Sequence, residues 1–215
     1  MANENAKIGI GRIYTAEILS IIAAIISIVA TVLMTLLGAA IKTDGESFNI
    51  NDVISIVTLV VGMVIAIVAF FLNLTGIRRA SEDEPAFSSA LIALIGQIVL
   101  SVLSTALSKH NFSEFLSIAE SVCEILVTYF VICGCINLAK RLNKEDVATY
   151  GKETIRMIFI VWIAGIILDL ISGILGKGGT VGSIISAILG IAALVCMIIT
   201  YIMYLRLLRK TINIL

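Results

Sequence analysis

The sequence predicts an all-α, polytopic membrane protein: one bundle of six transmembrane helices, arranged as three helical hairpins. Three observations predict this fold class. Hydrophobic residues make up 60% of the 215 residues, charged residues make up only 14%, and the apolar residues gather in six long stretches. An ordinary soluble domain is about 25% charged. The remaining residues are too few to cover a water-facing surface, so a soluble globule is excluded.

Each of the six stretches is long enough to cross a bilayer as a helix, which takes roughly 20 residues. They cover residues 18–41, 53–77, 86–108, 115–139, 157–176 and 181–205. Runs such as Ile21–Ile26 lack the alternation of polar and apolar residues that marks the strands of a membrane β-barrel. No linker or soluble segment is left over, and we expect a single domain over residues 1–215.

The ends of these elements agree with helices. The first stretch is too long for the core of a secretory signal, which is about 7–15 residues, and we expect it to be retained. The third follows Glu82, Asp83, Glu84 and Pro85, and acids before a proline are typical of a helix start. Basic residues follow the second, fourth and sixth stretches, where the carbonyl end of a helix favours cations.

The basic residues also predict the orientation. Lys42, Lys109 and Lys177 lie on one side of the bundle, and the other twelve Lys and Arg residues lie on the opposite side. Because cytoplasmic loops carry the excess of Lys and Arg, both termini are expected in the cytoplasm. The predicted location is the cell (plasma or inner) membrane, crossed in several passes. Fifteen basic and fifteen acidic residues cancel, so no net charge favours nucleic acid.

The helices align weakly as three repeats. Asn73 and Asn137 each precede a leucine near the end of an even-numbered helix, and Ala24, Gln97 and Gly165 align on the odd-numbered helices. Hairpins that all start on one side would be parallel repeats about an axis along the membrane normal. The alternative is that the shared topology alone produces the likeness, and both interpretations stay open.

Every helix carries a narrow face of small or hydroxyl residues at steps of three and four. The first offers Ser20, Ala24 and Ser27, and the second ends its face with Ala69 and Asn73. Lipid supplies no hydrophobic force between helices, so such faces allow close packing in a bundle. The same faces are also suited to lining a polar pathway.

Three carboxylates interrupt the half of the bundle away from the basic loops: Glu120, Glu124 and Asp169. At 1.5 Å per residue, Glu124 lies about 12 Å and Asp169 about 10 Å from the outer helix ends, whereas Glu120 lies at about 6 Å. No Lys or Arg lies in any span to pair with them. An ionisable residue inside a membrane span indicates a functional site by default.

Several arrangements would accommodate these acids. In the first, the acids are protonated and form hydrogen bonds between helices. In the second, they face water in an outward vestibule. In the third, they hold a cation such as an amine or a metal ion. Gln97 and Ser101 would complete such a site if the third helix adjoins the fifth. The candidate ligand-binding residues are therefore Glu120, Glu124, Asp169, Gln97 and Ser101.

No enzymatic chemistry is predicted. All four cysteines lie inside spans, His110 is the only histidine, and no nucleophile–base pair, metal cluster or nucleotide motif is present. We therefore expect neither a cofactor nor a bound structural metal.

Two functions remain. The first is a solute-binding or transport-type protein with an outward-facing acidic site for a cation or small polar solute. In span count, size, cytoplasmic termini and lack of a nucleotide site, the chain resembles the substrate-binding subunits of energy-coupling-factor vitamin transporters. That resemblance, in architecture alone, implies solute binding. The second is a structural or accessory subunit that docks on a membrane protein partner, or on a second copy, through inner segment 140–156.

Overall fold

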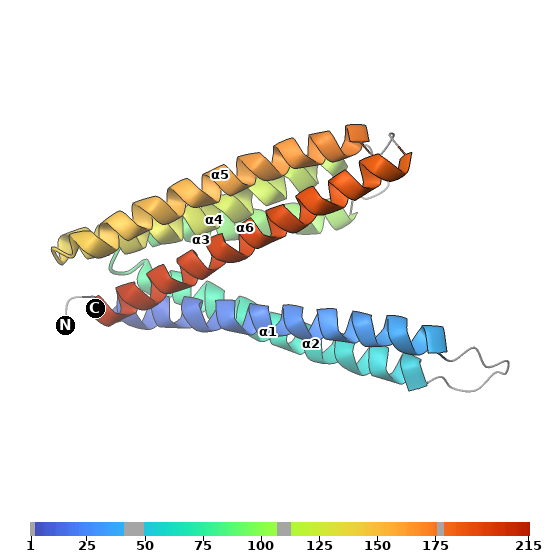
Figure 1. Ribbon diagram of the computed structural model, residues 1–215. Coiled ribbons are helices and arrows are strands. Elements are labelled where there is room, and N and C mark those ends of the chain that lie inside the picture. The colour runs from blue at the N-terminus through green and yellow to red at the C-terminus, as the bar shows by residue number, and fades with distance from the viewer. Residues whose placement is uncertain (1–2, 41–49, 107–112, 176–178) are drawn as a thin grey trace.

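The computed structural model describes residues 3–40, 50–106, 113–175 and 179–215, and every regular element among them is an α-helix. Figure 1 shows six long helices in antiparallel hairpins. Their bounds are α1 Glu4–Ala40, α2 Ile50–Ala80, α3 Pro85–Ala106, α4 Ser113–Arg141, α5 Glu145–Leu175 and α6 Gly179–Ile214. The all-helical fold predicted from hydropathy is confirmed.

The helices pack chiefly within sequential hairpins, α1 with α2, α3 with α4 and α5 with α6. The starts of the odd-numbered helices and the ends of the even-numbered helices meet at one end of the molecule (Figure 1). We call this the basic end, because twelve of the fifteen Lys and Arg residues of the chain belong to it. Lys42, Lys109 and Lys177, predicted at the opposite end, lie outside the described residues, as does His110.

Five helices, α1, α2, α3, α4 and α6, are long and apolar enough to cross a membrane. The predicted span 157–176 on α5 lies partly outside the described residues, and a sixth crossing stays a prediction. Large apolar side chains face outward along these helices, as at Ile92 and Ile191, which are 70% and 67% exposed. Apolar surface on this scale is unfavourable in water and indicates contact with lipid.

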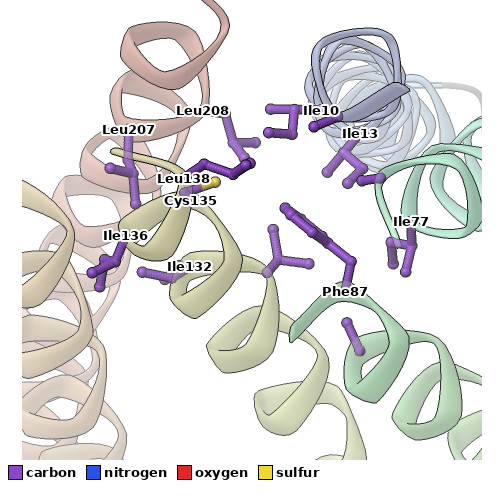
Figure 2. Packing of buried hydrophobic residues seen from close by; sticks show 14 of the residues in the cluster. Ile10, Ile13, Ile77, Phe87, Ile132, Cys135, Ile136, Leu138, Leu207 and Leu208 are labelled. Atoms are coloured by element: carbon purple, nitrogen blue, oxygen red, sulfur yellow. The ribbon is translucent and has the colours of Figure 1, made fainter. Parts of the chain in front are cut away.

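The buried core is concentrated at the basic end. Figure 2 shows side chains of α1, α2, α3, α4 and α6 converging there. Ile10 and Ile13 of α1, Phe87 of α3 and Leu208 of α6 are fully buried. The ring of Phe87 lies against Gly134, where an added Cβ would come within 2.5 Å of a ring carbon. Towards the opposite end the α1–α2 hairpin diverges from the other four helices (Figure 1).

Gly9 and Gly76 bring α1 and α2 into backbone contact at the basic end. A Cβ on Gly9 would lie 2.5 Å from the carbonyl oxygen of Gly76, and a Cβ on Gly76 would lie 2.8 Å from the carbonyl oxygen of Gly9. Small residues at such crossings let membrane helices approach closely, which supplies packing energy that lipid cannot.

A short turn at the basic end terminates α4. Asn143 has a φ of 56°, and the amide N–H of Lys144 donates to the carbonyl of Ala139 at 2.8 Å. This pattern closes α4 with a left-handed residue after its last turn. At the preceding connection α3 begins at Pro85, as the acids before it predict.

A polar network joins the hairpins at this end. The carboxylate of Glu84, only 4% exposed, pairs with the guanidinium of Arg141 and accepts a hydrogen bond of 3.0 Å from Nδ2 of Asn137. Asp83 accepts a bond of 2.7 Å from the amide N–H of Ala6 at the start of α1, where a free N–H and the helix dipole favour an acid. The connection between α2 and α3 is thereby tied to α1 and to α4.

The helix crossing at Gly9 predicts a contrast between two substitutions on the same turn of α1. Gly9→Ala places a methyl group on backbone atoms of α2 and should lower the free energy of unfolding by about 1–3 kcal/mol. Gly11→Ala meets nothing within 4 Å, and should leave stability unchanged or raise it through helix propensity. Thermal unfolding in mild detergent measures both. Equal midpoints for the two variants would contradict the crossing.

Candidate functional site

A cavity of about 850 Å³ lies next to the core, and all six helices contribute to its wall. Leu94, Val127, Val131 and Tyr204 are buried core residues that also line it. The cavity therefore begins where the packing of the basic end stops. From there its wall follows α3 as far as Val102, about two turns beyond Leu94.

Four of the five predicted ligand-binding residues line this cavity together: Gln97 and Ser101 on α3, Glu120 and Glu124 on α4. Spacings of four residues keep each pair on one face of its helix. The fifth, Asp169, follows Gly165 of the cavity wall by four positions on α5. The side chain of Asp169 lies outside the described residues.

The reason for this convergence differs from the one predicted. The prediction required α3 to adjoin α5, but in the described residues α3 packs against α4 and α2, and α5 packs against α4 and α6. Gln97 and Ser101 meet the two glutamates through the α3–α4 hairpin, and Val161, Trp162 and Gly165 of α5 also line the cavity.

A further carboxylate, Glu17 of α1, lines the same cavity and was not predicted. The hydroxyl of Tyr201 on α6 donates to Oε2 of Glu17 at 2.5 Å. This bond joins the first and last helices of the chain. A signal for Glu17 existed: it lies three residues before Ser20 and seven before Ala24, on the small and polar face predicted for the first helix.

Asn73 of α2 is also part of the wall. Its side-chain oxygen is buried and has no hydrogen-bond partner in the described residues. A buried acceptor without a donor costs about 1–3 kcal/mol. Asn137, the aligned residue of α4, instead donates to Glu84, so the two repeat positions have different roles.

The electrostatics of the cavity are one-sided. Glu17, Glu120 and Glu124 line it, and no Lys, Arg or His does so in the part of the chain that the structure describes. Glu124 is close enough to Glu17 for their charges to interact. Among the same residues, the carboxylates of Glu120 and Glu124 have no hydrogen-bond donor. Such a wall favours a positively charged or donor-rich occupant.

The acids are distributed around the cavity. Within the described ranges, no three His, Cys, Asp or Glu side chains come together closely enough to hold a metal ion. Four aromatic rings line the same cavity: Phe70 of α2, Trp162 of α5, and Tyr201 and Tyr204 of α6. Faces of Trp and Tyr rings attract cations, and the mixture of acids and rings resembles the chemistry that recognises organic ammonium groups.

No family model, curated protein or solved structure matches this chain. The function therefore has to be inferred from the residues and their geometry.

The bond between Tyr201 and Glu17 predicts a measurable contribution to stability. Tyr201→Phe removes the donor of Glu17 while keeping the ring, and should lower the free energy of unfolding by about 1 kcal/mol, typical of hydrogen bonds between membrane helices. Tyr14→Phe is the matched control, because the structure gives the Tyr14 hydroxyl no hydrogen bond. The measurement is thermal unfolding in detergent, and an unchanged midpoint for Tyr201→Phe would show that the bond contributes nothing.

Proposed function

We propose that this integral membrane protein is a transport-type protein that binds a cation or small polar solute in the cavity between its helices. The observation that carries the proposal is the composition of the cavity wall. Three carboxylates, from α1 and α4, line one cavity together with Gln97 and Asn73, and no described Lys, Arg or His balances them. Unbalanced acids inside a membrane span are costly and mark pathways for ions or substrates.

The size and chemistry of the cavity favour an organic cation. About 850 Å³ is within the range of small-molecule sites, roughly 300–1,000 Å³. In this assignment Glu124 and Glu120 attract the positive charge, Trp162 and Tyr201 offer ring faces to it, and Gln97 and Ser101 bond polar groups of the solute. Asp169 is the further acid that we assign to the site, on the same helix as Trp162.

The topology belongs to the same proposal. We place six crossings in the cell membrane, with the basic end and both termini in the cytoplasm. The twelve basic residues gathered at that end support this orientation. Since the cavity lies beyond the packed core of the basic end, a solute would then enter it from the outer side.

The second candidate function is a structural or accessory subunit. The observation that favours it is the surface of segment 140–156, where Lys144, Glu145, Lys152 and Arg156 are exposed in mixed charge at the basic end. Such a surface suits docking on a partner. In that case the acids of the cavity serve packing and assembly, and the protein binds no solute.

Binding of cations distinguishes the two functions. Trp162, the only tryptophan, lines the cavity and reports occupancy through its fluorescence. We expect saturable changes when the purified protein is titrated with at least one of tetraethylammonium, guanidinium and Na⁺. Glu124→Gln should weaken that binding about tenfold or more, because a hydrogen bond to a charged group is worth about 1.5–3 kcal/mol.

The matched control is Glu153→Gln, which removes an exposed acid of α5 that is not part of the cavity wall. This variant should bind as the wild type does. If none of the three cations gives a saturable change, or if Glu124→Gln and Glu153→Gln bind equally well, the transport-type assignment is wrong and the accessory function is favoured.

A further inference from the structure

A second cavity, of about 370 Å³, lies at the basic end on the α1–α2 hairpin, away from the acidic cavity. Three arginines line it: Arg12 from α1, and Arg78 and Arg79 from the last turn of α2. Asn5, Thr75 and Glu82 complete the wall. The contact of the two helices at Gly9 and Gly76 holds these arginines beside one another.

One of the three guanidinium groups is positioned by the protein. Nε of Arg79 donates to Oδ1 of Asn5 at 3.3 Å, which leaves the two terminal nitrogens of Arg79 to bind elsewhere. Arg12 and Arg78 have no hydrogen bond or ion pair with any residue that the structure describes. Thr75 donates its hydroxyl to the carbonyl of Phe71 at 2.8 Å, so the arginines supply the donors of this cavity.

The charges of this cavity do not balance. Guanidinium groups stay protonated at every physiological pH, and Glu82 is the one acid in the wall. Three positive charges against one negative charge leave a net charge of about +2 to be met by an anion. Arginine binds the oxygens of phosphate in a bidentate fork, and several forks around one small cavity suit a single phosphate group.

An apolar strip leads from this cavity along α2. From Thr75 towards the start of α2, the strip contains Phe71, Val68 and Val64. They come at steps of four, three and four residues and lie on one face of the helix. They are 57%, 46% and 55% exposed. A basic cavity that passes into an exposed apolar strip matches the order of a lipid, in which the phosphate lies at the surface and the acyl chain extends into hydrocarbon.

We propose that Arg12, Arg78 and Arg79 form a binding site for a phosphate group, and that its source is the head group of an anionic lipid. The apolar strip of α2 receives the first acyl chain. This site is separate from the acidic cavity, and it does not depend on the proposed transport function. It would anchor the α1–α2 hairpin, the one that diverges from the other helices, at the surface of the membrane.

The test is retention of lipid by the full chain, measured by native mass spectrometry from detergent containing equal amounts of phosphatidic acid, phosphatidylglycerol and phosphatidylcholine. The wild type should retain the two anionic lipids in preference to phosphatidylcholine. Arg12→Gln combined with Arg78→Gln should reduce that retention about fivefold for each charge removed. Arg209→Gln, an exposed arginine of α6 outside this cavity, is the control and should retain lipid as the wild type does.

Two further measurements test whether the site binds phosphate and whether the phosphate belongs to a lipid. Arg12→Lys combined with Arg78→Lys keeps the charge but loses the fork, and a phosphate site predicts a partial loss that bulk attraction does not. Inorganic phosphate at millimolar concentration should leave the lipid in place; if it displaces the lipid, the phosphate site stands but a soluble phosphate is its natural source. Equal retention by the wild type and the Gln variants, or equal retention of phosphatidylcholine, would overturn the proposal.

Discussion

Hydrocarbon as the surrounding solvent is the constraint on which the rest of this structure depends. Hydrocarbon forms no hydrogen bonds and supplies no hydrophobic force that would bury apolar side chains. The helices therefore carry large exposed residues such as Ile92. Their association has to come from close packing and polar contacts. Both are concentrated at the basic end, where Gly9 meets Gly76 and Glu84 joins Arg141 and Asn137.

That uneven packing is what places the acidic cavity. A core that extended along the whole bundle would leave no space around Glu120 and Glu124. Because the core stops at Tyr204 and Leu94, the polar faces of the helices meet around a cavity beyond it. In the same arrangement Glu17 of α1 accepts a hydrogen bond from Tyr201 of α6. Fold and candidate site therefore follow from one division of the molecule into a packed end and a cavity.

The helices and most of the site could be predicted from sequence, because hydropathy and helical spacing are local properties. Pro85 at a helix start, the paired hairpins, and the shared faces of Gln97 with Ser101 and of Glu120 with Glu124 all follow from such patterns. Glu17 was missed because the apolar stretch begins one residue after it, whereas α1 begins at Glu4. The role of Tyr201 depends on contact between the first and last helices, which no local pattern reveals.

The most direct measurement compares two positions on α3 in a membrane-embedded variant whose four cysteines are replaced by alanine. The thiol introduced by Ser101→Cys lines the cavity and should react with a water-soluble cationic methanethiosulfonate. The thiol introduced by Ile92→Cys replaces a side chain that is 70% exposed, yet it should stay unreactive because hydrocarbon surrounds it. A reactive thiol at position 92, or an unreactive thiol at position 101, would contradict a lipid-embedded bundle around a polar cavity.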